Sequence, residues 1–502
     1  MNSTELTSEI SKTFCFQPTA EQLRAMETFS DFMFRRSSST AMILRGSAGT
    51  GKTSLAAAIV KTLLRLGQRV VLLAPTGRAA KVFSLNSGQP ARTIHRCIYR
   101  QKAFAGVDTA FNLNLNTCKN TLFIVDEASM IANGVYSGGD GLFGSGRLLD
   151  DLMRFVYSGD NCHLMLIGDK AQLPPVGESE SPALEARVIE GYGIEVFECD
   201  MNEVLRQCSG SGILFNATII RQMITHDEMT QLPKIHFDGF ADIHLVDGNE
   251  LVEQLSTSYS RVGIDETMVI TRSNRRANIF NQGIRNMILD RDEELCSGDR
   301  LMIVKNNYHW TERDILAERE AKKMFADQPP SPSETTDAEA DIAIPSFLAN
   351  GDIAVVQRVR NVREFYGFRF ADVWLRFPDY DGYETQLTVL MDSLQSESPS
   401  LTQEQQESLF RGVFDDYFDK PTKAEKIKAV REDDYYNALQ VKYAYAVTCH
   451  KAQGGQWEHI YLDQGYMTDE MLNPDYIHWL YTAFTRATKE LYLVNWPKTQ
   501  RM

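Results

Sequence analysis

Short apolar runs alternate with helix-like segments over the first 200 residues of the chain. The runs lie at residues 41–45, 68–74, 121–125 and 162–167. Continuous apolar runs of this length predict buried strands. Residues 18–36 and 52–66 instead carry apolar side chains at helical spacing, and the second segment ends at Gly67. Strands that alternate with helices predict a parallel sheet of the α/β class.

A second α/β series begins near residue 266, and its segments lie far apart in the chain. Helices are predicted at 272–288 and 476–487. The strand-like runs lie at 267–271, 444–448, 459–463 and 491–494. The residues between these segments therefore form an insertion.

The insertion contains three kinds of sequence. Alternating runs at 354–359 and 373–377 predict a small β-barrel or meander. Residues 329–336, PPSPSETT, are acidic and rich in proline and serine, so we expect a mobile loop over about 325–345. Residues 399–432 are polar and favour helix.

Composition and charge narrow the class of protein. A chain of 502 residues predicts two to four domains, and 43% hydrophobic residues is ordinary for a globular protein. The net charge of -15 argues against a general nucleic-acid binder, although a groove can still be basic. No apolar window is long enough to span a membrane, and the N-terminus does not resemble a secretory signal. The eight cysteines form no CxxC pair, which favours reduced thiols in a cytoplasmic protein over structural zinc.

The run RGSAGTGKTS, residues 45–54, fits the pattern G-x-x-x-x-G-K-[ST] between a strand and a helix. Glycines let the backbone aim N–H groups at phosphate oxygens, and the helix dipole favours an anion there. In this pattern Lys52 reaches the β- and γ-phosphates and Thr53 offers its hydroxyl to Mg²⁺. The alternative is a glycine-rich turn. The predicted nucleotide-binding residues are Gly46, Ser47, Ala48, Gly49, Thr50, Gly51, Lys52, Thr53 and Ser54.

Two further groups supply the chemistry of hydrolysis. Asp126 follows a buried strand and is suited to hold Mg²⁺, and Glu127 is suited to take a proton from the attacking water. The same pair also fits an ordinary helix N-cap. Gln172 follows another strand, where its amide can orient that water; the alternative is a proline-terminated surface loop.

Six segments resemble the motifs of superfamily 1 helicases. They are APTGRAAKVF at 74–83, RTIHRCIY at 92–99, DEAS at 126–129, GDKAQLPPVG at 168–177, TCHKAQGGQW at 448–457 and YTAFTRATKELYLV at 481–494. Their order is that of the family, and the likeness is greatest to its RecD/Dda/Pif branch. The resemblance implies an ATP- and Mg²⁺-dependent DNA helicase that moves 5′ to 3′ on single-stranded DNA.

The resemblance also implies roles for residues outside the phosphate-binding loop. Gln22, in FQPTAEQ, would read the adenine edge. Arg206 and Arg486 would reach the γ-phosphate from the second lobe, where a fork of donors stabilises developing charge. Taken singly, each arginine also fits a surface salt bridge. Gln456 stands where many relatives carry a glutamate for the ribose, and an amide can still hydrogen-bond a hydroxyl.

Contacts to the DNA strand are expected from hydroxyls, amides and cations of both lobes. His95 alternatively fits a core histidine, and Arg275 and Arg276, beside Asn274, fit a solvated helix face. The candidate contacts are Thr76, Arg78, Lys81, His95, Asn274, Thr448, His450, Lys451 and Gln453.

The expected fold is α/β, with two RecA-like parallel-sheet lobes of the P-loop NTPase type. A hairpin in the first lobe would carry Phe104 and Phe111, either as a wedge that splits the duplex or packed beneath the hairpin. The segment FLANGD, at 347–352, recurs in the same helicase branch, and the insertion that it begins, 347–378, resembles the SH3-like barrel of that branch. We expect the first lobe at 1–98 and 121–203, its hairpin at 99–120, the second lobe at 204–300 and 436–502, and the barrel insertion at 301–435.

The expected partners are single-stranded DNA and single-strand/duplex junctions, with the protein cytoplasmic and associated with the nucleoid when it binds DNA. Two other functions fit the same motifs: an RNA translocase of the superfamily, or a regulatory ATP switch that acts on a protein partner. Repair, recombination and replication restart all fit the resemblance.

Overall fold

The computed structural model describes residues 1–35, 39–100, 112–134, 144–203, 210–225, 231–326, 344–345 and 347–502. They form two compact units. The first combines the described residues up to Ser273 with Val447–Met502, and the second is Asn274–Ala446. Among the described residues, the first unit holds a six-stranded sheet, a five-stranded sheet and one two-stranded pair, and the second unit holds a closed barrel, so the predicted fold class is confirmed. The domain boundaries stay a prediction. Within the described ranges, no helix combines the length and apolar character needed to cross a membrane.

The first sheet of unit 1 has six strands in the order β3-β2-β6-β7-β1-β8, and neighbouring strands run parallel. The strands are β1 (Thr40–Gly46), β2 (Arg69–Ala74), β3 (Ala91–Thr93), β6 (Thr121–Val125), β7 (His163–Gly168) and β8 (Glu195–Met201). All four runs predicted as strands in this region are confirmed. The edge strand β8 was not predicted, because Glu195, Glu198 and Asp200 interrupt its apolar pattern.

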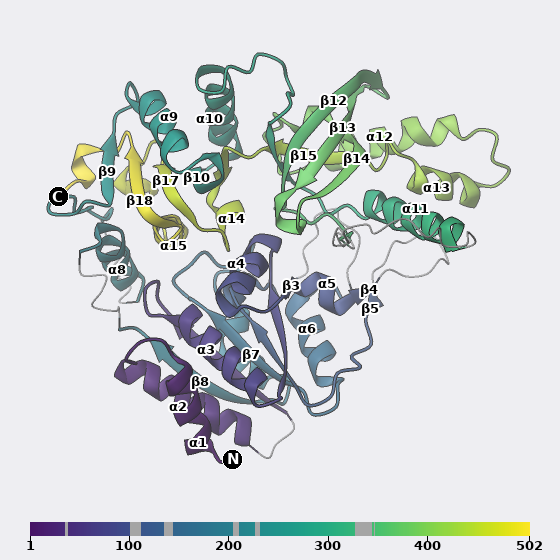
Figure 1. Cartoon of the computed structure of the whole chain (residues 1–502). Coiled ribbons are helices and arrows are strands. Elements are labelled where there is room, and N and C mark those ends of the chain that lie inside the picture. The colour runs from purple at the N-terminus through teal and green to yellow at the C-terminus, as the bar shows by residue number, and fades with distance from the viewer. Residues whose placement is uncertain are drawn as a thin grey trace, which may run out of the picture. The chain divides into compact units, whose positions relative to one another are not determined.

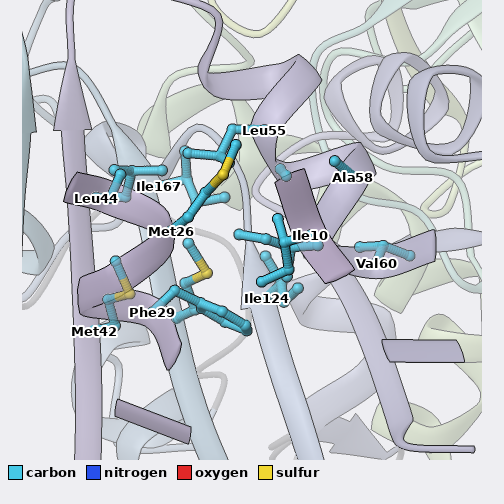
Figure 2. Close-up of a cluster of buried hydrophobic side chains, with 14 of the residues drawn as sticks. Ile10, Met26, Phe29, Met42, Leu44, Leu55, Ala58, Val60, Ile124 and Ile167 are labelled. Carbon is cyan, nitrogen blue, oxygen red and sulfur yellow. The ribbon is translucent and has the colours of Figure 1, made fainter. Parts of the chain in front are cut away.

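Three N-terminal helices build the core beneath the phosphate-binding loop (Figure 1). They are α1 (Ser3–Thr13), α2 (Ala20–Phe34) and α3 (Lys52–Arg65). Figure 2 shows their side chains Ile10, Met26 and Leu55 packed against Leu44 and Ile124 of the sheet. This packing fixes β1 and α3, the two elements that the loop joins. The other helices of this part are α4 (Gly77–Ser87), α5 (Ile94–Ile98), α6 (Leu148–Tyr157) and α7 (Ala186–Glu190).

Two short strands within the predicted hairpin of the first lobe pair antiparallel. Its strands are β4 (Tyr99–Arg100) and β5 (Asn112–Leu113). Phe104 and Phe111 lie outside the described residues. Their role as a wedge therefore stays a prediction.

The second sheet of unit 1 has the order β16-β10-β17-β18-β9. From β10 to β9 its neighbouring strands run parallel. The predicted helix 476–487 is corrected to end at Phe484, because Ala487 already begins a strand. The strands are β9 (Ile243–Val246), β10 (Thr267–Thr271), β16 (Ala446–Thr448), β17 (Trp457–Asp463) and β18 (Ala487–Val494). The helices are α8 (Gly212–Thr225), α9 (Leu251–Arg261), α14 (Cys449–Ala452) and α15 (Pro474–Phe484).

Unit 2 is built around a barrel of five strands, which confirms the predicted barrel. Alternating residues of β13, Ala371, Val373 and Leu375, are buried on one face of the strand, as the pleat of a strand requires. The strands are β11 (Arg300–Ile303), β12 (Ile353–Phe365), β13 (Phe368–Phe377), β14 (Tyr383–Leu390) and β15 (Leu439–Tyr443). The helices are α10 (Asn274–Met287), α11 (His309–Ala326), α12 (Gln403–Asp416) and α13 (Lys423–Glu432). Residues 327–343 of the predicted loop lie outside the described residues.

Candidate nucleotide-binding site

The phosphate-binding loop joins β1 to α3 and needs glycine at two points for different reasons. A Cβ on Gly46 would lie 2.9 Å from both the Met201 carbonyl oxygen and Thr50 Oγ1, so no larger residue fits. Gly51 caps α3 with a φ of 83°, in the left-handed region that glycine tolerates best. The first N–H groups of α3 have no partner within the helix and face the loop. The loop therefore has the backbone of an anion site.

The Lys52 ammonium bends back over this loop. Its Nζ donates to the carbonyl oxygens of Gly46 at 2.7 Å and Ser47 at 2.9 Å. Ser47 Oγ is buried, and no described residue hydrogen-bonds to it. A positive charge and an unsatisfied hydroxyl thus lie in one pocket, which fits a bound phosphate group.

Asp126 and Glu127 follow β6 and lie in the same pocket as the loop. The Asp126 carboxylate accepts the Glu127 N–H at 2.9 Å, and Glu127 has a φ of 52° that turns the chain sharply. Desolvation, reinforced by the Glu127 carboxylate, raises the pKa of Asp126 to about 7. Thr53 lines this pocket as well. A hydroxyl and a carboxylate are the oxygen donors that Mg²⁺ prefers, so these residues fit the ion.

Glu127, Gln172 and Arg486 form one cluster. Arg486 Nη1 lies 3.8 Å from Glu127 Oε1. The Gln172 amide lies between them: in the orientation that satisfies both ends, it donates to Glu127 Oε2 at 3.3 Å and accepts from Arg486 Nη2 at 3.2 Å. Each member is therefore held by the other two, beside the phosphate-binding loop. The cluster thus joins a carboxylate, an amide and a guanidinium, side chains that fit phosphoryl transfer.

Arg486 comes from the second sheet, between α15 and β18. Its guanidinium donates to the carbonyl oxygens of Thr482 at 3.1 Å and Gly455 at 3.2 Å, and the side chain is 2% exposed. These contacts fix a cation in a buried position, where its interactions are stronger than in water. Arg206, its predicted companion, lies outside the described residues.

The pocket has a volume of about 430 Å³, within the range of small-molecule sites. The first sheet supplies the loop and the acidic pair, and the second sheet supplies Gly454, Gln456, Arg486 and Thr488. The structure thus brings together most of the residues predicted for nucleotide binding and hydrolysis. Those that line the pocket are Ser47, Ala48, Gly49, Gly51, Lys52, Thr53, Ser54, Asp126, Glu127, Gln172, Gln456 and Arg486.

Gln22 lies beneath the loop. Its side chain is 1% exposed, its Nε2 donates to the Thr50 carbonyl at 3.0 Å, and its Oε1 accepts the Thr19 N–H at 3.0 Å. Both ends of the amide thus bind protein atoms, and Gln22 supports the loop from below. Recognition of adenine by Gln22 stays a prediction.

The candidate DNA contacts of the first sheet occupy different environments. Thr76 caps α4 by accepting the Ala79 N–H at 3.2 Å. Arg78 donates to the Gln456 carbonyl at 2.9 Å and lies 4.5 Å over the Trp457 ring, so it binds the second sheet. Lys81 is partly buried. Burial lowers the pKa of His95 to about 4, which keeps it neutral near pH 7.

The remaining candidate DNA contacts also differ in burial and in hydrogen-bond partners. Thr448 and Lys451 are partly buried and His450 is exposed. Gln453 is buried and donates to the Leu173 carbonyl at 2.7 Å. Asn274, in unit 2, donates to the Glu397 carbonyl at 3.0 Å. All nine DNA contacts stay predictions, and Arg78 and Gln453 also have roles within the protein.

Sequence reasoning missed the contacts that α15 makes with the segment 169–173. Thr482 Oγ1 accepts the Leu173 N–H at 2.7 Å, and His478 Nδ1 lies 2.9 Å from the Ala171 carbonyl oxygen. Tyr481 binds Asp169 at 2.5 Å. These residues lie on an apolar helix, and their spacing alone is that of an ordinary core helix.

Two stretches of the chain match families of known domains. Residues 17–209 match the AAA domain, and residues 443–494 match the UvrD-like helicase C-terminal domain. The first stretch contains the phosphate-binding loop, Asp126, Glu127 and Gln172, and the second contains Gln456 and Arg486.

Several known helicases are similar to the chain. The ATP-dependent DNA helicase Dda of Enterobacteria phage T4 is 26% identical over 273 residues, 52% of this chain and 55% of that protein. The ATP-dependent RecD2 DNA helicase of Deinococcus radiodurans is 35% identical over 136 residues, 27% of this chain and 16% of that protein. The chain thus spans about half the length of the first relative and less of the second.

Among solved structures, the Pif1 helicase from Bacteroides, in complex with ADP-AlF3 and ssDNA, aligns with 96% of this chain. The alignment covers 94% of that chain at 15% identity, with a TM-score of 0.44. The two matched domain families, together with Dda and RecD2, confirm that the chain resembles superfamily 1 helicases of the RecD/Dda/Pif-like branch.

Proposed function

We propose that the chain is an ATP-dependent DNA helicase or translocase that moves 5′ to 3′ on single-stranded DNA. The observation that carries the proposal is the single pocket lined by Lys52 and Glu127 of the first sheet and Arg486 of the second. The similar proteins Dda and RecD2 are ATP-dependent DNA helicases, which supports the same activity here.

The chemistry follows from the residues of the pocket. The loop N–H groups and Lys52 bind the β- and γ-phosphates, and Glu127 takes a proton from the attacking water. Gln172, beside Glu127, orients that water. Arg486 stabilises the charge that develops on the transferred phosphoryl oxygens, with Arg206 as its proposed companion. Thr53 and Asp126 would hold Mg²⁺, which neutralises charge on the phosphates when bound.

Two glutamines, Gln456 and Gln22, would bind the rest of the nucleotide. Gln456 lines the pocket and offers a neutral amide to the ribose hydroxyls. Gln22 would read the adenine edge by turning out of its buried position, which would exchange a bond to Thr19 or Thr50 for one to the base. Loss of a buried hydrogen bond costs about 1 kcal/mol, which a new bond to the base can offset.

The pocket takes residues from both sheets, so ATP hydrolysis can change how the two sheets contact each other. When nucleotide fills and leaves the pocket, these contacts change, and a DNA strand that is bound to both sheets is moved. The strand contacts proposed are those named above, with hydroxyls, amides and cations directed at the backbone. Single-strand/duplex junctions are the proposed sites of unwinding. The proposed location is cytoplasmic, on the nucleoid when DNA is bound; the free thiols of every cysteine within the described ranges support this.

Steady-state ATPase assays of the full chain test the proposal. Hydrolysis with Mg²⁺ is measured alone, with oligo-dT and with an RNA strand of equal length. A DNA translocase responds to oligo-dT more strongly than to RNA. Equal or greater stimulation by RNA would favour the RNA translocase, and no response to either strand would favour a regulatory switch.

A further inference from the structure

Tyr481 connects the phosphate-binding loop to the segment that carries Gln172. It lies on α15, its side chain is 1% exposed, and its hydroxyl makes two hydrogen bonds. The hydroxyl donates to Asp169 Oδ2 at 2.5 Å and accepts the Ala48 N–H at 3.1 Å. One side chain of the second sheet thus binds both halves of the catalytic machinery of the first.

Asp169 in turn fixes the position of Gln172. Its Oδ1 accepts the Ala171 N–H at 3.0 Å, and its carbonyl accepts the Gln172 N–H at 3.2 Å. The carboxylate therefore shapes the turn that places the Gln172 amide between Glu127 and Arg486. A movement of the Asp169 side chain shifts this turn, because the same carboxyl group binds Tyr481 and the turn.

The bond between Ala48 and Tyr481 can be exchanged when a phosphate enters the loop. Ala48 lines the pocket, and loop N–H groups are the donors that bind phosphate oxygens. An anionic oxygen is a stronger acceptor than a neutral hydroxyl. Burial, together with Asp169, raises the pKa of Tyr481 well above its ordinary value, so the hydroxyl stays protonated and remains a donor.

We propose that Tyr481 is a positioning residue that couples the filling of the phosphate-binding loop to the placement of Gln172 through Asp169. The inference rests on the proposed function, because it concerns the same hydrolysis. Tyr481 does not touch the reacting atoms and acts through Asp169. Its neighbour Thr482 holds Leu173 and accepts from Arg486, so α15 places the amide and the guanidinium together.

A purely structural role makes a different prediction. If the hydroxyl only satisfies buried polar groups, its loss lowers stability and leaves turnover of the folded protein unchanged. If it positions Gln172, its loss lowers kcat while the KM for ATP changes little. The ring itself packs in the core, so Tyr481→Phe removes the hydroxyl and keeps the packing.

The test compares Tyr481→Phe with wild type and with the matched control Tyr476→Phe. Tyr476 lies on the same helix and is equally buried, and its hydroxyl donates to Gln464 Oε1 at 2.6 Å. For each full-length protein, kcat, KM for ATP and Tm are measured with saturating oligo-dT. We expect Tyr481→Phe to lower kcat by about 10- to 100-fold with KM within about twofold, as small misplacements of catalytic groups do. Tyr476→Phe should change Tm alone.

A kcat of Tyr481→Phe within about twofold of wild type would overturn the inference, as would an equal fall in Tyr476→Phe. If Tyr481→Phe does not fold, the variant Asp169→Asn tests the same inference. It keeps an oxygen for Ala171 but places an NH2 donor where Tyr481 has its acceptor, so an unchanged kcat contradicts the inference. A wild-type chain that shows no strand-stimulated hydrolysis would overturn the proposed function itself, before any variant is compared.

Discussion

The guanidinium of Arg486 lies 3.8 Å from the carboxylate of Glu127, although the two residues belong to different sheets. Arg486 follows α15 of the second sheet, and Glu127 follows β6 of the first. Both line the pocket that contains Lys52. A cation from the second sheet thus meets a carboxylate beside the phosphate-binding loop.

Lys52→Ala should lower ATP turnover by more than about 100-fold, because the charge on the β- and γ-phosphates loses its fixed cation. The measurement is steady-state ATPase with oligo-dT. Lys61→Ala is the matched control, since Lys61 is an exposed lysine on the same helix, and its turnover should equal that of wild type. Substantial turnover in Lys52→Ala would show that the loop is not the active site.

Arg486→Ala should raise the barrier of the chemical step by about 4–7 kcal/mol, as loss of an arginine finger does, and leave nucleotide binding largely intact. Single-turnover hydrolysis measures the first quantity, and ADP titration measures the second. Lys489→Ala removes an exposed cation of β18 that pairs with Glu458 at 2.7 Å, and should change neither. Weaker ADP binding with a normal chemical step would contradict the role of Arg486.

Unwinding should require a 5′ single-stranded tail, because the proposed function moves the chain 5′ to 3′, the direction that the resemblance to the RecD/Dda/Pif branch implies. Duplexes with a 5′ tail, a 3′ tail or blunt ends, each labelled on the displaced strand, make the comparison. We expect displacement from the 5′-tailed duplex only. A requirement for the 3′ tail would overturn the polarity while leaving the nucleotide site unaffected.

The sequence predicts much of the site because its signals are local. The glycines, Lys52 and Thr53 follow one another in the chain, so spacing alone identifies the loop. Contacts between distant segments have no such signal. The predicted DNA contact Arg78 lies over the Trp457 ring and donates to the Gln456 carbonyl in the structure. Local spacing cannot reveal these contacts between distant segments. Tyr481 was missed because a buried tyrosine on an apolar helix is usually part of the core.

The same distinction applies to the fold. Continuous apolar runs identified the central strands β1, β6 and β10, which are buried on both faces. The edge strand β9 (Ile243–Val246) was missed because it is short and half exposed, with a weak pattern. The barrel was predicted because its strands alternate between buried and exposed residues. Closure of the barrel depends on β11 and β15, which are distant in sequence.

Stability of the barrel should fall as pH rises from about 5 to 8. Asp352 is buried and accepts from Ala349 N at 2.7 Å and the Tyr380 hydroxyl at 2.5 Å. Burial nevertheless raises its pKa to about 7, above the ordinary value near 4. The folded chain therefore holds this proton more tightly than the unfolded chain. The contribution of this proton to the stability of the folded chain is fully present below about pH 4 and is lost as pH rises through 7.

Asp352→Asn should remove this dependence. Thermal unfolding at pH 5 and pH 8 measures it, and the fall in Tm should be smaller in the variant than in wild type by about 3 °C or more. Asp381→Asn, at an exposed turn near the end of β13, should keep the wild-type dependence. An equal dependence in Asp352→Asn and wild type would show that Asp352 is ionised throughout.

The most direct test of the central claim is an experimental structure of the chain with ADP, Mg²⁺, fluoroaluminate and oligo-dT. Fluoroaluminate takes the place of the transferred phosphoryl group. We predict that Lys52 Nζ and the Arg486 guanidinium both lie within hydrogen-bonding distance of it, with Glu127 facing the attacking water. Arg486 remote from the fluoroaluminate, with its hydrogen bonds to Gly455 and Thr482 unchanged, would contradict hydrolysis by residues of both sheets.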